Sequence, residues 1–362
     1  MIYLDWSATT PICEVAKKTI IEHLDDFGNP SSSYELGYKA KELIENARER
    51  IANCINAEPN EIYFTSGGSE ADTWALRGKN SLASNIEHHA IHSTFKFKVD
   101  SDGLIDCNHI EELIKEHSVR YKPIEIISCM AVNNEIGTIL PIKEVTEIAH
   151  KHNILFHTDA VQAIGHIPIN VKDIGCDMLS ASGHKFGAPK GVGFLFVKSG
   201  IKMSPLIYGG KQEAGIRGST ENVLGIIAMA AALEDSIVNM QKRNAHIKRL
   251  RDRLLTRLLS INGVMLNGSF SRRIDSNINI RINGVKGQDV VSLADQYGIC
   301  ISAGSACNEG IEAPSHVLKA IGLTDKEALS SIRITIGYQN IDEEIDETIK
   351  SLKEVIEILR KY

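Results

Sequence analysis

Two stretches in the first half of the chain carry apolar residues at helical spacing. In residues 31–56 and 142–152, apolar side chains recur among Lys, Glu and Arg at about every third or fourth position. Such spacing places the apolar residues on one face of a helix. We therefore predict two amphipathic helices, each of which buries one face.

Short apolar runs separate these helical stretches and are typical of strands. They cover residues 61–65, 124–132, 154–158, 177–180 and 192–197. Strands that alternate with helices along a chain form βαβ units, in which the sheet is mainly parallel. The pattern predicts an α/β fold whose ligands bind at the carboxyl ends of the strands.

A long helical stretch follows at residues 219–260. Its first part (226–233) is apolar and is expected to be buried, whereas its second part (242–251) is basic and is expected to be exposed. A basic helix face is usually solvated, so we do not interpret the run as a nucleic-acid site. Because no Pro/Gly/Ser-rich linker is present, this helix is predicted to join two domains.

The last third of the chain changes to an α+β pattern, which predicts a smaller second domain. The expected strands and helices cover residues 278–282, 288–297, 299–302, 331–336 and 342–360.

Composition fits an ordinary globular protein of 362 residues with 43% hydrophobic and 24% charged positions. The 40 Lys and Arg residues against 46 Asp and Glu give a net charge of −6, which argues against a protein that coats nucleic acid or a membrane surface. The N-terminus lacks secretory-signal features, and no window approaches the roughly 18 unbroken apolar residues of a membrane span. We expect a cytoplasmic protein with no membrane and no direct nucleic-acid partner.

The seven cysteines are odd in number and widely scattered, which indicates reduced thiols. Most are expected to be small buried hydrophobes. Residues 302–315 differ, because this Gly/Ser-rich stretch places Cys307 in a segment expected to be an exposed, mobile loop. Cys300, on an apolar strand, is expected to belong to the core.

A second stretch with candidate chemistry is residues 180–191, where a predicted strand ends in small residues around His184 and Lys185. A lysine in such a loop is most often an exposed surface residue. A loop rich in hydroxyl and imidazole groups also suits a buried amine that forms a Schiff base. Asp159 ends another predicted strand, so both side chains are expected at one sheet edge, where the carboxylate can pair with a protonated pyridine nitrogen.

A strand–turn–helix segment at residues 65–70 supplies backbone N–H groups and the Ser69 hydroxyl at a helix N-terminus. Such a turn can bind phosphate. A plain helix N-cap explains the same residues about as well.

The chain resembles the fold-type I, class V aminotransferase-like enzymes that use pyridoxal 5'-phosphate (PLP), and within them the cysteine desulfurases that supply sulfur for iron–sulfur clusters and thionucleosides. The resemblance implies a large domain with a mainly parallel sheet flanked by helices, formed by residues 15–255. Residues 1–14 and 256–362 would form a smaller α+β domain that carries the mobile cysteine loop. The matching motifs cover residues 3–11, 27–32, 87–88, 132–137, 159–162, 182–185, 304–307 and 331–333.

The resemblance implies a role for each residue around the PLP ring. Lys185 would form the Schiff base and later move protons at the substrate. Asp159 would face the pyridine nitrogen and Gln162 the phenolic oxygen. His88 would stack on the ring and act in acid/base steps, although a histidine considered alone is more often structural. The neighbouring His89 and His92 have no further ligand nearby, so we predict no metal site.

The resemblance also implies the phosphate and substrate contacts. Arg333 would bind the substrate carboxylate, since a planar guanidinium pairs with it bidentately. Asn134 would assist at this carboxylate and at the cofactor oxygen. Because one phosphate contact would come from the other subunit, the active site would require a homodimer. The implied phosphate contacts are Gly68, Ser69, Ser182, His184 and, from the partner, Thr220.

The resemblance implies that the type of reaction depends on Cys307. The resemblance implies that its thiolate attacks the sulfur of bound L-cysteine, keeps that sulfur as a persulfide and passes it to an acceptor protein, while L-alanine is released. A selenocysteine lyase or another PLP β-lyase is an alternative on the same fold. A non-catalytic sulfur-carrier or regulatory subunit is a further alternative.

Three departures from the family pattern bear on the acceptor. Scaffold-delivering members carry a C-terminal docking extension, whereas this chain stops at Tyr362. Ala214 stands where the family commonly has arginine, and Gly-Ser precedes Thr220 where Ser-Gly is usual. Asn-Glu-Gly follows Cys307 in place of small hydroxyl residues. Together they favour a dedicated sulfur donor, for DNA phosphorothioation or tRNA thiolation.

Overall fold

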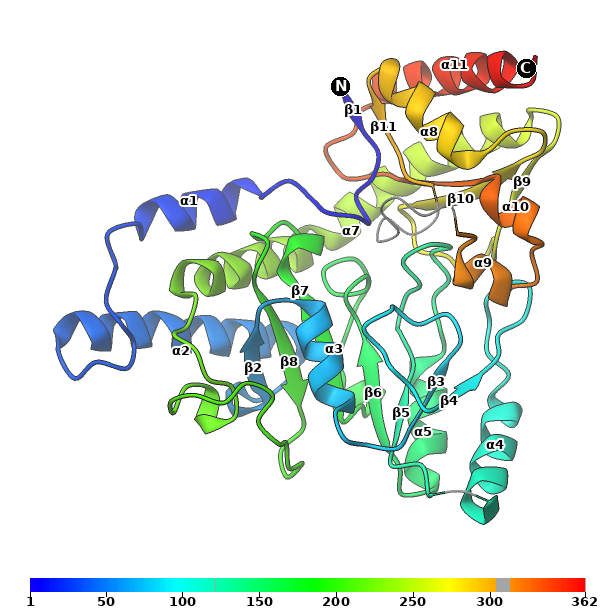
Figure 1. Ribbon diagram of the computed structural model, residues 1–362. Coiled ribbons are helices and arrows are strands. Elements are labelled where there is room, and N and C mark those ends of the chain that lie inside the picture. The colour runs from blue at the N-terminus through cyan, green and yellow to red at the C-terminus, as the bar shows by residue number, and fades with distance from the viewer. Residues whose placement is uncertain (121, 304–312, 362) are drawn as a thin grey trace.

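A seven-stranded sheet lies at the centre of the larger part of the molecule (Figure 1). The computed structural model describes residues 1–120, 122–303 and 313–361. The strand order is β2-β8-β7-β6-β5-β3-β4, and β8 alone runs antiparallel to both of its neighbours. The mainly parallel sheet predicted from the sequence is therefore confirmed. The strands are β2 (Ile62–Thr65), β3 (Ser81–Ser84), β4 (Phe95–Phe97), β5 (Ile126–Ser128), β6 (Leu155–Asp159), β7 (Met178–Ser182) and β8 (Gly193–Val197).

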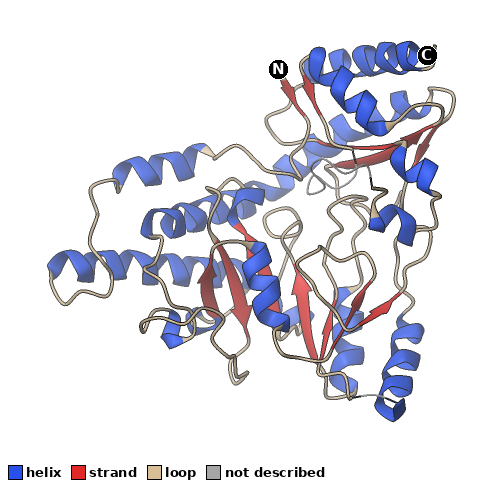
Figure 2. Ribbon diagram, in the orientation of Figure 1, coloured by secondary structure: helices blue, strands red, loops and turns tan. Residues whose placement is uncertain are grey.

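Helices cover this sheet, as Figure 2 shows by colour. Helix α3 packs on β7 and β8, α5 packs on β6, and α7 packs along α1 and α2. Because both faces of the inner strands are covered, every residue of β7 and β8 is buried, including Ser180 and Ser182 of β7. The helices are α1 (Glu14–Glu22), α2 (Glu35–Ile55), α3 (Gly68–Leu76), α4 (Cys107–Arg120), α5 (Ile142–Lys151), α6 (Val171–Ile174) and α7 (Val223–Leu259).

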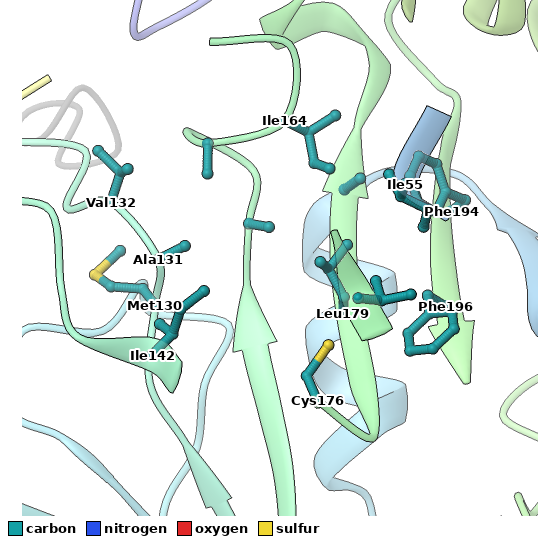
Figure 3. Close-up of a cluster of buried hydrophobic side chains, with 14 of the residues drawn as sticks. Ile55, Met130, Ala131, Val132, Ile142, Ile164, Cys176, Leu179, Phe194 and Phe196 are labelled. Atoms are coloured by element: carbon teal, nitrogen blue, oxygen red, sulfur yellow. The ribbon is translucent and has the colours of Figure 1, made fainter. Parts of the chain in front are cut away.

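The main hydrophobic core lies between the sheet and these helices. Figure 3 shows Phe194 and Phe196 of β8 beside Leu179 of β7, near Ile55 at the end of α2. Helix α2 buries residues along one face and ends at Asn56, whose left-handed backbone (φ 59°) stops the helix. The amphipathic pattern in residues 31–56 thus marks a helix that closes the core.

The smaller part of the molecule contains a three-stranded antiparallel sheet with a hydrophobic cluster of its own. Both chain termini lie in this part of the molecule (Figure 1). The N-terminal strand β1 pairs in parallel with β11. The elements are β1 (Ile2–Tyr3), β9 (Val264–Leu266), β10 (Asn277–Ile282), α8 (Gly287–Gln296), β11 (Ile299–Cys300), α9 (His316–Ala320), α10 (Asp325–Leu329), β12 (Ser331–Thr335) and α11 (Asp342–Leu359). The boundaries that we assigned to the two domains stay a prediction.

Helix α7 runs between the two hydrophobic clusters, and one expectation for it was wrong. Its basic second half is not simply exposed, because Leu250 and Leu254 on one face are buried in the smaller cluster. Arg249 and Arg253, each next in sequence to one of these leucines, both contact Asp342 of α11. The basic run therefore forms an amphipathic segment with intramolecular ion pairs.

Helix α7 also has the length and apolarity needed to cross a bilayer, the one such helix within the part of the chain that the structure describes. Of its qualifying window, 56% is buried inside the protein. A core helix satisfies the same test of length and composition, and the contacts of α7 are those of a core helix.

Candidate functional site

A cavity of about 480 Å³ opens at the carboxyl ends of β6 and β7. Its volume lies in the range of small-ligand sites. Of the predicted site residues that the structure describes, all but Thr220 line it. Those that line it are Gly68, Ser69, His88, Asn134, Asp159, Gln162, Ser182, His184, Lys185 and Arg333.

Asp159 and Lys185 reach the cavity from neighbouring parallel strands. Asp159 is the last residue of β6, and Lys185 ends the 3₁₀ turn Gly183–Lys185 that follows β7. The Val161 N–H donates to Asp159 Oδ1 over 2.8 Å. Burial raises the pKa of Asp159, while the nearby His88 and Lys185 act in the opposite direction. A carboxyl group in this position is stabilised as an anion by a cationic partner in the cavity.

The N-terminal segment crosses the cavity and holds Lys185. The lysine Nζ donates to the carbonyl oxygens of Ser7 (2.6 Å) and Ala8 (2.9 Å). Gln162 Nε2 donates to the same Ser7 oxygen over 3.0 Å. No sequence pattern predicts this role for residues 7 and 8, because any residue type can supply a carbonyl oxygen.

His88 enters the cavity as a neutral imidazole. Burial lowers its pKa, and the Ala90 N–H donates to Nδ1 over 3.2 Å. A neutral ring that accepts at Nδ1 carries its proton on Nε2. His88 thus has one N–H donor left for a ligand.

A cup whose shape suits an anion lies at the start of α3. A Cβ atom on Gly68 would lie only 2.6 Å from Val161 Cγ2, so this turn approaches the end of β6 closely. Across the cup, His184 Nδ1 lies 3.1 Å from Thr9 Oγ1, and burial lowers its pKa to about 4. Free backbone N–H groups at a helix N-terminus, together with hydroxyl and imidazole groups, suit a phosphate.

An ion pair brings the segment before α7 to this cup. Arg217 contacts Glu70 through two hydrogen bonds, Nε–Oε1 at 2.9 Å and Nη2–Oε2 at 3.1 Å. Glu70 Oε2 also accepts from the Ser66 N–H over 2.8 Å. Three residues beyond Arg217, Thr220 is exposed and does not line the cavity of its own chain.

Arg333 forms the end of the cavity nearest the smaller sheet. Its side chain is only 2% exposed. Nη1 donates to the Asn134 carbonyl over 3.0 Å, and Nη2 donates to Asp5 Oδ1 over 2.8 Å. A buried guanidinium at one end, a lysine in the middle and an anion cup at the other end can bind a ligand with two acidic groups.

Comparison with known proteins agrees with this arrangement. The aminotransferase class-V family matches residues 2–348. A cysteine desulfurase IscS from Clostridium botulinum is 42% identical over 99% of this chain and 95% of its own length. The chain belongs to the class-V aminotransferases and, within them, to the cysteine desulfurase family. The expected family resemblance is confirmed.

Solved structures support the fold of this cysteine desulfurase family member. A NifS-like protein from Rickettsia africae has a TM-score of 0.91 and 33% identity, with 99% of each chain covered. A structure described as SspA in complex with cysteine has a TM-score of 0.81 and 30% identity, and covers 94% of this chain and 100% of its own. The fold-type I architecture expected from the sequence is therefore confirmed.

A buried polar network that was not predicted from the sequence lies behind the cavity of this family member. His157 contacts Ser128 through Nδ1 and Ser180 through Nε2, each at 2.9 Å. Its Nε2 lies 3.7 Å from Oδ1 of Asp72, a buried carboxyl that lines the cavity. Burial, and then the proximity of Asp159, raise the pKa of Asp72. A polar residue inside an otherwise apolar helix, as Asp72 is in α3, was the available signal.

The described cysteines are all free thiols. Burial raises the pKa of Cys129 and of Cys54, the latter to about 12, which keeps both protonated. Cys300, expected in the core, is partly exposed, and burial also raises its pKa. Cys307, the predicted sulfur acceptor, lies outside the described residues. Within the described ranges, no group of three or more His, Cys, Asp or Glu side chains could hold a metal ion.

Proposed function

We propose that this cysteine desulfurase family member converts L-cysteine to L-alanine and keeps the sulfur as a persulfide on Cys307. The observation that carries the proposal is the convergence of Lys185, Asp159, His88 and Arg333 on one cavity beside an anion cup. The sequence relatives named cysteine desulfurase support the same reaction.

Pyridoxal 5'-phosphate is the cofactor, and the cavity residues fit it. The cup at Gly68 suits the phosphate, with contacts from Ser69, Ser182 and His184. Asp159, a buried carboxyl whose pKa is raised by burial, suits a protonated pyridine nitrogen. When bound, PLP supplies an electron sink that stabilises negative charge at the substrate Cα.

The protein residues bind the substrate and move its protons. Arg333 receives the α-carboxylate, with Asn134 beside it. Lys185 would hold the cofactor, and its Nζ would take and return the proton at the substrate Cα. The carbonyls of Ser7 and Ala8 bind this Nζ. His88, with Nε2–H as its donor, and Gln162 would hold the cofactor ring and its phenolic oxygen.

Sulfur transfer then needs one nucleophile. The Cys307 thiolate attacks Sγ of the substrate, and a sulfur–sulfur bond forms as the Cβ–Sγ bond breaks. The bonding electrons stay with Cβ, which is protonated to give alanine. The products are L-alanine and a Cys307 persulfide, so atoms and electrons balance without an added oxidant.

Two substitutions test this function. We expect Cys307→Ser to keep the yellow colour of bound PLP but to stop alanine and sulfide production from L-cysteine, because only the nucleophile is lost. Lys185→Ala should lose both the colour and the activity, and Cys300→Ser is the matched control that keeps both. Full activity of Cys307→Ser would instead indicate a β-lyase of the selenocysteine lyase type. A colourless protein that PLP cannot reconstitute would contradict the enzyme proposal.

The active unit that we propose is a homodimer in which Thr220 reaches the partner's cofactor phosphate. Its exposure at the surface, outside the lining of its own chain's cavity, supports this role. Residues 14–38, here called the N-terminal arm, expose several apolar side chains, including Phe27 (80% exposed) and Ile21 (68%). Such a surface is typical of an interface with a second chain.

We place the enzyme in the cytoplasm, a location supported by the free thiols of the described cysteines. The persulfide passes to an acceptor protein, and DNA phosphorothioation and tRNA thiolation stay the predicted pathways. Capture of partners on the persulfidated protein, with Cys307→Ser as the control bait, identifies the acceptor.

A further inference from the structure

The arginine proposed to bind the substrate carboxylate already has an anionic partner within the chain. Asp5 Oδ1 accepts from Arg333 Nη2 over 2.8 Å, and Asp5 Oδ2 accepts from the Ser302 hydroxyl over 2.7 Å. Ser302 Oγ also lies 3.4 Å from Nη2. The Asp5 side chain thus neutralises the charge that would attract the substrate.

The backbone fixes this arrangement from both sides. Ser302 and Arg333 exchange two main-chain hydrogen bonds, of 3.1 Å and 2.7 Å, and Asp5 forms a bridge with Thr335, two residues beyond Arg333. Asp5 is therefore held beside the guanidinium by its own chain segment, and Arg333 is held in turn by the Asn134 carbonyl. Neither side chain needs to move for the pair to persist.

The Nε–H of Arg333 is a buried donor that is left for a ligand. Among the described residues, it has no hydrogen-bond partner. A buried polar atom without a partner costs free energy, and an acceptor that arrives there recovers it. Since Arg333 lines the cavity, the Nε–H is the open position for a carboxylate oxygen.

We infer that Asp5 is a positioning residue that weakens carboxylate binding at Arg333 and directs the substrate carboxylate to the open Nε side of the guanidinium. The inference rests on the proposed role of Arg333 as the carboxylate site. A carboxylate that enters the cavity meets one positive and one negative charge, so its attraction to Arg333 is reduced. Asp5 thereby selects for ligands whose other groups also bind, such as the amino group and thiol of cysteine.

The substitution Asp5→Asn tests this inference, because the amide keeps the shape and an oxygen acceptor but removes the charge. We expect KM for L-cysteine to fall about tenfold with a smaller change in kcat, as removal of a nearby like charge predicts. Competitive inhibition by 3-mercaptopropionate, which has the thiol and carboxylate but no amino group, should tighten by a similar factor. Inhibition by cysteamine, which has no carboxylate, should not change.

Two comparisons separate failure of this inference from failure of the proposed function. Arg333→Gln should raise KM for cysteine and weaken inhibition by 3-mercaptopropionate. If it changes neither quantity, Arg333 is not the carboxylate site. Suppose that Arg333→Gln acts as expected. If Asp5→Asn then leaves KM and the inhibition constant unchanged, or weakens inhibition by 3-mercaptopropionate, Asp5 is only a structural partner of Arg333.

Should Asp5→Asn fail to fold, the substitution Asp5→Glu is the second test, because it brings the carboxylate nearer to the cavity. Asp5→Glu must then weaken inhibition by 3-mercaptopropionate and leave inhibition by cysteamine unchanged. An equal effect on both inhibitors would overturn the inference.

Discussion

Glu87, the residue before His88, shows how strongly burial acts on single side chains around this cavity. Its carboxyl is buried, and Oε1 accepts hydrogen bonds from the Ser84 hydroxyl and from the Met130 N–H. Burial raises the pKa of Glu87 to about 8, against an ordinary value of 4.5. The folded protein therefore keeps Glu87 protonated at pH values where the unfolded chain has released the proton.

This difference predicts a pH-dependent stability. Because the folded pKa is raised, the contribution of Glu87 is fully present below pH 4.5 and is lost as pH rises to about 8. The loss amounts to about 1.4 kcal/mol per pH unit inside that window. Glu87→Gln stays neutral and keeps an acceptor at Oε1, so its stability relative to the parent should increase with pH. Urea unfolding of both proteins at several pH values measures this difference.

The control for Glu87→Gln is Glu49→Gln on the exposed side of α2. Its stability relative to the parent should not change over the same pH range. If the stability of Glu87→Gln relative to the parent is also independent of pH, Glu87 is ionised in the folded protein.

The sequence predicted the positions of those site residues that directly follow a strand. Asp159 and Lys185 could be placed together because they follow neighbouring strands of a parallel sheet. The carbonyls of Ser7 and Ala8, and the pairing of Asp5 with Arg333, could not be derived in this way. These contacts join segments about 180 to 330 positions apart, and no local pattern encodes them.

At the scale of elements, apolar patterning located β2, β5, β6, β7 and β8 of the central sheet but not β3 and β4. β7 and β8 are mainly apolar and wholly buried because both faces are covered, and residues 177–180 and 192–197 gave that signal. β3 (Ser81–Ser84) and β4 (Phe95–Phe97) are short and partly polar, so they were not predicted. The run at 124–132 gave only the short β5, because the chain leaves the sheet after Ser128 to line the cavity.

An element-scale prediction concerns the junction between α3 and the segment before α7. Arg217→Met breaks the two hydrogen bonds to Glu70, a pair with only 15% and 10% side-chain exposure. A partly buried pair of this kind contributes about 1.5 kcal/mol, so we expect roughly tenfold faster release of PLP while the fold persists. Release is followed as loss of the visible band when an apo-protein trap is present.

The matched control is Arg249→Met, which breaks a more exposed ion pair with Asp342 on α11. Exposed pairs contribute about 0–1 kcal/mol, and this one lies away from the cavity, so PLP release should keep its rate. Equal rates for the Arg217→Met and parent proteins would mean that the Glu70 pair does not support the phosphate cup.

At the scale of the whole molecule, one chain leaves two features without a partner. The N-terminal arm carries exposed apolar side chains and extends from the sheet with α1 and the start of α2 (Figure 1). Tyr208, in the segment that leads to Thr220, is also 79% exposed. A homodimer with two-fold symmetry would cover the same patches on both subunits and bring Thr220 to the partner's cavity.

Mixed dimers test this arrangement. Thr220→Glu places a carboxylate against the cofactor phosphate and should prevent PLP binding in whichever site it faces, and Lys185→Ala inactivates the site of its own chain. In a dimer of the two variants, one site combines both defects, whereas the other has an intact Lys185 and receives an intact Thr220. We therefore expect that two inactive proteins, co-expressed and purified through two different tags, give an active mixed dimer with one working site. If Thr220 served its own chain, each site would keep a defect and the mixed dimer would stay inactive.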